Sequence, residues 1–422
     1  MVDCGLFQAG KFAEERNFEH FPFNPREISA LLVTHGHLDH IGRIPKLVKE
    51  GFGGKIFSTN ATRDLSQLML SDSLRVIKKE VGEKSGLYGE NDIDAAMKQW
   101  EGLNYHEPFE IGDFKINFKD AGHILGSAII EVFYGEKKIV FTGDLGNSPT
   151  PLLKSTEEIK DANFLIIETT YGDREHEGKE ERKIKLERII EDTIKAGGVL
   201  MIPAFSLERT QELLFELNDL VENSRIPKVP VFVDSPLAIN AINIYKKYDD
   251  YYNKEAKYIM DSGDDLFNFP GLKFTLTTEG SKQINDVPGP KVIIAGSGMS
   301  TGGRIIHHER RYLQDPKSTL LLISYQVAGS LGRQLKDGAK EVNILGETVP
   351  VKARIYTLEG YSAHPDKNGL FQFVENNCET LEKVFAIQAE PKSALYFVQT
   401  IRDHLGLNAI APKYGDSFEL GG

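Results

Sequence analysis

Four short segments, three of them apolar and one alternating between apolar and polar residues, are each followed by a histidine or a carboxylate, and they constrain the fold of this 422-residue chain more than any other feature. The segments are residues 30–33, 115–119, 138–141 and 164–167, and the polar residues that follow them are His35, His123, Asp144 and Glu168. Their length and composition predict strands, and open α/β sheets carry their chemistry at the carboxyl ends of strands. One such residue more often belongs to a cap or turn, but four in succession predict a site along one sheet edge.

The first strand end has the densest group of potential metal ligands, because residues 35–40 read His-Gly-His-Leu-Asp-His. The expected ligands are His35, His37 and His123 for one ion and Asp39, His40 and Asp144 for a second, with Asp144 bridging the two. Imidazole and carboxylate groups favour zinc, with manganese and iron as alternatives. Chance grouping is a weak alternative, since the chain has only 11 histidines. Two ions about 4 Å apart activate a bridging hydroxide, which suits phosphodiester hydrolysis.

Another predicted strand, within residues 349–358, leads to His364, which the first ion does not need as a ligand. With Glu168 to orient it, His364 suits a general acid that protonates the leaving oxygen. The alternative is a turn residue beside Ser362. We therefore expect His364, Glu168 and Asp39 to be the catalytic side chains.

Residues 173–346 alternate strands and helices, which predicts a second α/β domain with a parallel sheet, inserted into the first. A Gly-rich loop at residues 296–303 opens a helix that carries Arg304, and such a loop can bind phosphate through backbone N–H groups. The alternative is a solvated helix face. The residues expected to contact substrate are Arg209, Ser297, Gly298, Ser300, Arg304 and Arg333.

The composition limits the cellular setting and the way in which substrate is bound. The net charge of −12 disfavours non-specific binding of nucleic acid, so a polyanionic substrate needs bound metal and a few placed cations. Only two cysteines, Cys4 and Cys378, are present, which favours a reducing cytoplasm over a disulfide framework. We find no signal-peptide pattern and no apolar run long enough to cross a membrane.

These motifs resemble those of the metallo-β-lactamase superfamily and, within it, of the β-CASP nucleases, in the branch of prokaryotic relatives of the cleavage and polyadenylation specificity factor endonuclease. Residues 35–40 match the metal signature, and Asp3, His123 and Asp144 match the other superfamily motifs. Glu168 and residues 360–364 resemble the first two β-CASP motifs. Residues 202–212, 294–299 and 325–333 resemble the β-CASP insert, so the resemblance covers nearly the whole chain.

The resemblance implies an αββα metallo-β-lactamase sandwich, incomplete at its N-terminus, with an inserted α/β β-CASP domain. The expected domains are residues 1–172 and 347–422 for the sandwich and 173–346 for the insert. It also implies a cytoplasmic ribonuclease with two Zn²⁺ sites, RNA or single-stranded DNA as substrate, a homodimeric assembly and no membrane partner. Asp3 is expected to support the site rather than to bind metal.

Two departures from the family pattern affect these expectations. The third β-CASP motif provides a histidine for the second ion, and here Gln388 occupies that position. An amide is a poor zinc ligand, so we expect weaker binding of the second ion. The strands that precede Asp3 in the family are absent, which predicts an unpaired sheet edge; we expect a mis-called start codon or a truncated gene as the cause, with a partner that covers the edge as the alternative. A catalytically impaired RNA-binding paralogue and a small-molecule metallo-hydrolase are therefore the alternatives.

Overall fold

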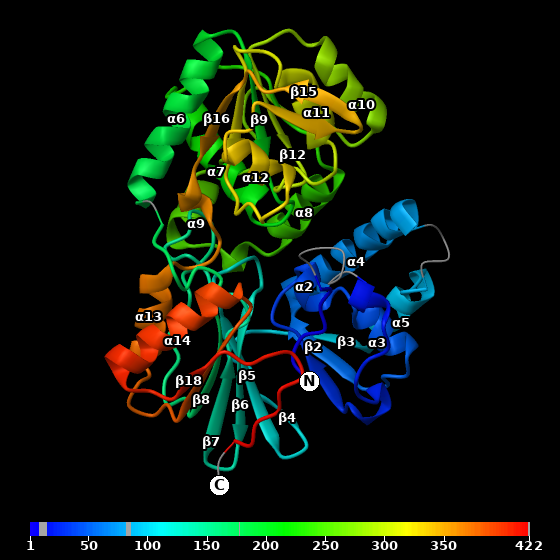
Figure 1. The fold of residues 1–422 in the computed structure, drawn as a ribbon, viewed down its shortest axis with the longest axis vertical. Coiled ribbons are helices and arrows are strands. Elements are labelled where there is room, and N and C mark those ends of the chain that lie inside the picture. Colours follow the sequence, from blue (N-terminus) through cyan, green and yellow to red (C-terminus); the bar gives the residue numbers. More distant parts are fainter. Residues whose placement is uncertain (8–14, 82–85, 177, 421–422) are drawn as a thin grey trace. The chain divides into compact units, whose positions relative to one another are not determined.

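The computed structural model describes residues 1–7, 15–81, 86–176 and 178–420 (Figure 1). The chain forms two compact units, one of Met1–Glu175 with Ala363–Gly422 and the other of His176–Ser362. The sequence predicts that the chain returns to the first domain at residue 347, whereas in this division it returns at Ala363. Strand β16 (Arg354–Thr357) pairs in parallel with β13 (Thr319–Leu322) and so belongs to the sheet of the second unit. Its apolar pattern alone does not tell which sheet it joins.

Within the described residues, the larger sheet of the first unit has seven strands in the order β18-β17-β8-β7-β6-β5-β4. Strands β4 to β7 pair antiparallel, whereas β7, β8, β17 and β18 are parallel. The strands are β4 (Phe109–Ile111), β5 (Phe114–Asp120), β6 (Ala128–Tyr134), β7 (Lys137–Phe141), β8 (Phe164–Glu168), β17 (Lys383–Ile387) and β18 (Ala409–Ile410). The parallel pairing of β7, β8 and β17 aligns their carboxyl ends at one edge.

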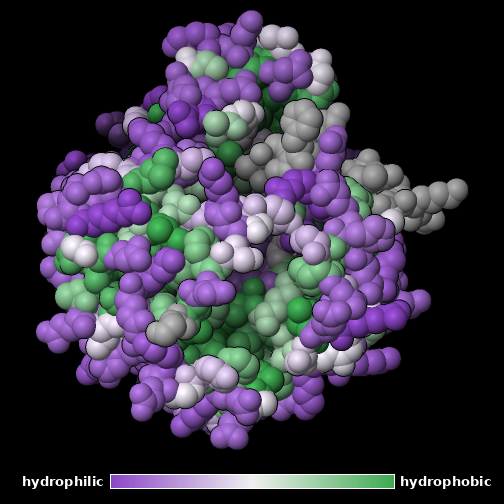
Figure 2. Space-filling view, turned by 60° about the horizontal axis from the view of Figure 1, so that its bottom comes forward, coloured by the Kyte–Doolittle hydropathy of each residue, from purple (hydrophilic) through white to green (hydrophobic). Residues whose placement is uncertain are grey.

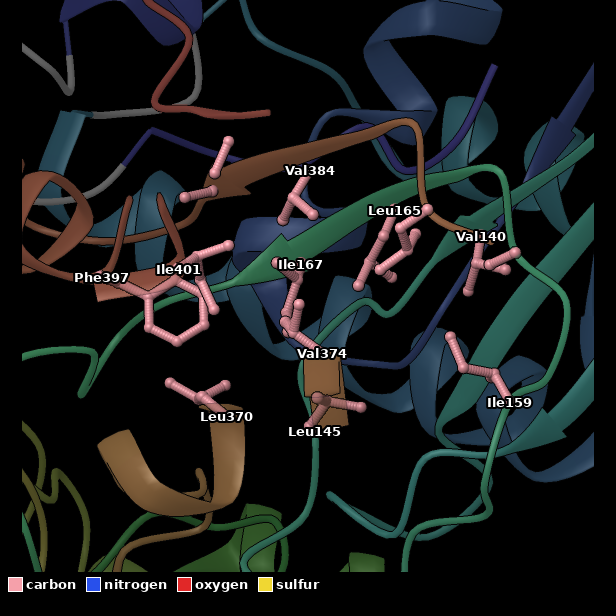
Figure 3. Close-up of a cluster of buried hydrophobic side chains, with 14 of the residues drawn as sticks. Val140, Leu145, Ile159, Leu165, Ile167, Leu370, Val374, Val384, Phe397 and Ile401 are labelled. Atoms are coloured by element: carbon pink, nitrogen blue, oxygen red, sulfur yellow. The ribbon is translucent and has the colours of Figure 1, made fainter. Parts of the chain in front are cut away.

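Two helices, α13 (Lys367–Glu375) and α14 (Pro391–Leu405), cover one face of this sheet. Figure 3 shows the side chains of Leu165 and Ile167 from β8 gathered with Leu370 from α13 and Phe397 from α14. Leu165, Ile167 and Leu370 are fully buried. This core fixes β8, and therefore the position of Glu168 at its end.

A smaller parallel sheet, in the order β1-β2-β3, carries the metal motif. Its elements and its covering helices are β1 (Ala30–Leu32), β2 (Lys55–Thr59), β3 (Trp100–Leu103), α2 (Leu38–Ile41), α3 (Ile44–Lys49), α4 (Asn60–Val81) and α5 (Glu90–Gln99). Leu31 packs with the helices and Leu32 packs with β5 and β6 of the larger sheet. This alternation makes the helix–sheet–sheet–helix layering that the sequence predicts.

The first residues of the chain lie along the outer side of β1. Val2 forms a parallel bridge with Leu32, and the amide of Asp3 donates to the carbonyl of Leu32 at 2.9 Å. Beside them is a cavity of about 680 Å³, whose apolar lining includes Ile116 and Phe141. Figure 2 shows hydrophobic residues gathered in a hollow on the face turned toward the viewer. Residues 1–3 thus extend the smaller sheet on the side of β1, and the expected unpaired edge beyond them stays a prediction.

The second unit is built on a parallel sheet of six strands in its described residues, in the order β11-β10-β12-β9-β13-β16. The further strands are β9 (Val199–Pro203), β10 (Val231–Val233), β11 (Leu272–Phe274), β12 (Lys291–Ala295) and the hairpin of β14 (Glu341–Ile344) with β15 (Glu347–Pro350). The helices are α6 (Lys179–Lys195), α7 (Arg209–Glu222), α8 (Pro236–Lys247), α9 (Lys254–Asp261), α10 (Thr278–Gln283), α11 (Ile305–Tyr312) and α12 (Leu331–Lys336). Among the described residues, no helix combines the length and the apolar character needed to span a bilayer.

Candidate metal centre

All of the predicted metal ligands lie in the first unit, at the ends of its strands. The loop after β1 carries His35 and His37, and the short helix α2 that follows carries Asp39 and His40. The turn between β5 and β6 carries His123, and Asp144 follows β7. The structure thus brings residues from three separate strand ends, those of β1, β5 and β7, to one place, as the sequence predicts.

His35, His37, His123 and Asp144 form the first cluster, and each offers one atom within 4.8 Å of the others. Nε2 of His35 lies 3.1 Å from Nδ1 of His37, which lies 3.3 Å from Nε2 of His123. Oδ2 of Asp144 lies 3.5 Å from Nε2 of His35 and 3.6 Å from Nε2 of His123. Ligand atoms about 2.0–2.1 Å from a tetrahedral zinc ion lie about 3.3–3.4 Å apart, so this cluster fits one such ion.

Burial and the neighbouring imidazoles disfavour the charged forms of His35 and His37 by lowering the pKa of each. Burial lowers the pKa of His35 well below its ordinary value, and the neighbouring His40 adds to the effect. Burial likewise lowers the pKa of His37 to about 4. For Asp144 burial acts in the opposite direction, but His40 and His35 outweigh it and hold the pKa well below its ordinary value. Neutral imidazoles and an ionised carboxylate are the forms that bind metal.

Asp39, His40 and Asp144 form the second cluster. Oδ1 of Asp144 lies 3.4 Å from Nε2 of His40, while its Oδ2 faces the first cluster. One carboxylate is thereby shared between the two clusters, which is the bridging position predicted for Asp144. Gln388, directly after β17, reaches the same place, with its Nε2 3.1 Å from Oδ2 of Asp39 and 3.2 Å from Nε2 of His40.

Asp3 supports the metal centre through contacts with Thr34 and His40. Its carboxylate accepts from the amide of Thr34 at 2.8 Å and from the Thr34 hydroxyl at 2.8 Å, and lies 2.7 Å from Nδ1 of His40. Burial alone lowers the pKa of His40, but Asp144, Asp3 and Asp39 together raise it well above its ordinary value. Sequence reasoning missed Thr34, whose hydroxyl also lies 3.0 Å from Nδ1 of His35. Its position directly before the motif is the signal that could have identified it.

His364 and Glu168 form a pair beside the first cluster. Nδ1 of His364 lies 2.8 and 3.0 Å from the two carboxylate oxygens of Glu168, which is 1% exposed. Glu168 also accepts from the amide of Leu145 at 2.8 Å, which fixes the carboxylate. Burial opposes protonation of His364, yet Glu168 and then Asp144 raise its pKa to about 9. The ring lies 4.7 Å from that of His123, close to the centre.

The predicted substrate-contacting residues lie in the second unit, and three of them, Arg209, Gly298 and Ser300, are buried. Arg209 is paired with Glu212, and its guanidinium donates to the carbonyl of Tyr361. The hydroxyl of Ser300 donates to Glu309. These contacts give Arg209 and Ser300 structural roles within the second unit.

The other four predicted contact residues belong to the Gly-rich loop and its neighbours. Arg304 donates to Asp234 at 2.7 Å and to two backbone carbonyl groups. Gly298 is buried, and Ser297 is partly exposed, with its hydroxyl 3.2 Å from that of Thr301. The guanidinium of Arg333 is on the surface and pairs with Asp337. Direct contact of these residues with substrate stays a prediction.

Comparison with known families accounts for most of the chain. Residues 1–194 match the metallo-β-lactamase superfamily, residues 210–335 match the β-CASP domain, and residues 348–412 match the Zn-dependent metallo-hydrolase RNA specificity domain. A solved structure of a protein of unknown function from Enterococcus faecalis has a TM-score of 0.50 at 12% identity, over 92% of this chain and 80% of that one. At this identity, the structural likeness concerns the fold alone.

Three curated proteins illustrate the sequence relationship. Ribonuclease TTHA0252 of Thermus thermophilus is 37% identical over 89% of this chain and 85% of its own length. An RNase J-like protein of Methanocaldococcus jannaschii is 32% identical over 98% of this chain and 92% of its own length. Transcription termination factor FttA of the same organism is 33% identical over 95% of this chain, which spans 65% of that factor.

Proposed function

This chain belongs to the metallo-β-lactamase superfamily and, within it, to the β-CASP ribonucleases, and we propose that its strand-end centre hydrolyses RNA phosphodiester bonds with Zn²⁺ and His364 as general acid. Metal-dependent hydrolysis of RNA follows from the family. The residue roles and the identity of the metal are our proposal. The observation that carries it is the convergence of three imidazoles, two of them buried, and one carboxylate at ligand-to-ligand spacing, beside the pair of His364 and Glu168.

The first cluster would hold the zinc ion. His35, His37 and His123 provide nitrogen ligands and Asp144 an oxygen ligand, a donor set that zinc accepts readily. Bound zinc supplies Lewis acidity, which activates water near neutral pH and polarises a phosphoryl oxygen. Asp39, which belongs to the adjoining second cluster, is proposed to orient the attacking water through its carboxylate. Asp3 and Thr34 support the loop that carries His35 and the histidine of α2.

His364 is proposed to be the general acid, which donates a proton to the leaving group. With a pKa of about 9, the imidazole carries both ring protons near neutral pH, and Nδ1–H is directed at Glu168. The proton on Nε2 is then the one transferred to the leaving ribose oxygen as the phosphorus–oxygen bond breaks. Positioned acids of this kind contribute about 10²–10⁴-fold in rate. Glu168 holds the ring in place and stabilises its charged form.

RNA is favoured over a small-molecule substrate by the match of residues 348–412 to an RNA specificity domain and by the ribonuclease relatives. Single-stranded DNA is the second substrate to test, and the predicted homodimer and cytoplasmic location stay predictions. Gln388 raises the possibility of an impaired enzyme, so the assay must include an inactive reference.

The test is cleavage of an end-labelled RNA and a matched single-stranded DNA by protein supplied with Zn²⁺ and Mn²⁺. Asp144→Asn removes the shared carboxylate and is expected to abolish cleavage, whereas the same substitution at the exposed Asp161 should leave it unchanged. His364→Gln should lose about 10²-fold or more, in contrast to the exposed His404→Gln. Cleavage that survives Asp144→Asn, or metal-loaded protein that hydrolyses only thioesters or lactams, would overturn the proposal.

A further inference from the structure

Gln388 closes the second cluster with its own hydrogen bonds. Its side chain reaches across 349 residues of sequence to donate from Nε2 to Oδ2 of Asp39 at 3.1 Å. The same nitrogen lies 3.2 Å from Nε2 of His40. Both are atoms that a second ion would need as ligands, so the amide occupies the place from which the family's histidine would bind.

An amide presents opposite polarity at its two ends, which makes this arrangement unfavourable for a cation. The N–H group donates to the carboxylate of Asp39 here, whereas a metal ion requires the carbonyl oxygen to face inward. A second ion would have to break the bond to Asp39 and turn the amide over. Only the side chain would turn, because hydrogen bonds hold the backbone of this segment in place. The carbonyl of Gln388 accepts from the hydroxyl of Thr170 at 3.1 Å, and the carbonyl of Ile387 accepts from the amide of Thr169 at 2.9 Å.

The two clusters also differ in the type of ligand that they offer. The first has three imidazoles and one carboxylate oxygen. With the amide turned over, the second would have the imidazole of His40 and oxygens from Asp39, Asp144 and Gln388. Oxygen-rich sites suit hard ions such as Mn²⁺ better than they suit zinc.

From these observations we propose that the centre retains one zinc ion, in the first cluster, and that Gln388 makes the second cluster a weak site that prefers Mn²⁺ to Zn²⁺. This inference rests on the proposed metal centre, and it adds a stoichiometry and a metal preference set by one side chain. Exchange of a supporting group alone costs about 10–100-fold in metal affinity. We expect loss of an imidazole ligand to weaken zinc at the second position by at least that factor.

Metal content tests the stoichiometry without reference to activity. Purified protein is saturated with zinc, desalted and analysed for metal per chain. Wild type should retain about one zinc per chain, and Gln388→His, which restores an imidazole, about two. Gln314→His is the matched control, since Gln314 is an exposed amide beside Arg310, and it should match wild type. Two zinc ions retained by wild type, or one retained by Gln388→His, would overturn the inference.

Manganese binding tests the preference. Zinc-loaded protein is titrated with Mn²⁺, and free Mn²⁺ is followed by electron paramagnetic resonance. Wild type should bind one weak Mn²⁺, and Gln388→Glu, which adds a carboxylate and removes the N–H donor, should bind it at least about tenfold tighter. This second variant decides the question if Gln388→His does not fold. Unchanged Mn²⁺ affinity in Gln388→Glu would contradict the inference.

The two proposals fail in different ways. Wild type that retains no zinc would overturn the metal centre and this inference together. Wild type with one zinc and no RNA cleavage in the presence of Mn²⁺ would contradict the proposed function and leave the assignment of Gln388 intact.

Discussion

Gly143 offers the sharpest test of how the backbone positions the centre. It precedes Asp144, has φ of +53°, and a Cβ added there would lie 2.6 Å from Cβ and 2.8 Å from Oγ1 of Thr34. Thr34 is bonded to Asp3 and lies beside His35, so Gly143→Ala should displace the support of the metal loop. Gly135 is a matched control, because it has φ of +56° at the other end of β7 and nothing within 4 Å of an added Cβ.

The surroundings of the two glycines determine how much the free energies of unfolding of the two variants differ. A left-handed conformation costs an alanine about 1–2 kcal/mol, and this applies to both glycines. Overpacking adds about 1–3 kcal/mol, and this applies to Gly143 alone. Gly135→Ala should therefore destabilise the metal-free protein by about 1–2 kcal/mol and Gly143→Ala by about 2–5 kcal/mol.

Urea unfolding of the metal-free protein measures the first effect, and zinc affinity measures the second. Gly143→Ala should also bind zinc about 10–100-fold more weakly, since Thr34 supports His35, while Gly135→Ala should bind it normally. Equal destabilisation in the two variants, together with unchanged zinc affinity, would refute the argument that Thr34 and Gly143 position the loop.

Three further predictions use other contacts of the first unit. Because Glu168 holds the pKa of His364 at about 9, cleavage should fall as the pH rises through that value, and in Glu168→Gln the fall should move down toward about 6.5. The stability contributed by this pair is complete below about pH 6.5 and is lost as the pH passes 9, so urea unfolding of wild type at pH 6 and pH 10 should differ more than that of Glu168→Gln. Leu165→Ala, in the fully buried core under α13 and α14, should cost about 2–5 kcal/mol in urea unfolding and leave zinc affinity unchanged; a change in zinc affinity would show that this core and the centre are coupled. Removal of zinc with a chelator should lower the melting temperature, because zinc binds the folded state. A melting temperature that does not change when zinc is added would contradict the proposed metal site.

The metal centre could be predicted from sequence because strand-end logic depends only on local pattern. His35, His37, His123 and Asp144 follow apolar or alternating segments, and strand polarity brings such ends together whatever the order of the strands. The same logic failed for residues 349–358, where pairing with β13 rather than local pattern decides which sheet the strand joins. It also gives no signal for β3, since Trp100–Leu103 directly follows the charged helix α5.

Side-chain contacts made only in the folded chain explain most of the other differences. Arg209 and Ser300 look like exposed polar residues in the sequence, yet each is buried against a carboxylate in the structure. The resemblance to the third β-CASP motif placed Gln388 at the second cluster. Its hydrogen bond to Asp39 could not be predicted, because the direction of an amide depends on neighbours that only the folded chain supplies.

The central claim is that the strand-end cluster is a metal-dependent centre for RNA cleavage, and one measurement tests it most directly. Chelator-treated protein is assayed for cleavage of a labelled RNA before and after Zn²⁺ and Mn²⁺ are returned. The account predicts no cleavage without metal and its recovery when the ions are restored, with Asp144→Asn inactive throughout. Cleavage by the metal-free protein, or none by protein shown to contain zinc in the presence of Mn²⁺, would contradict it.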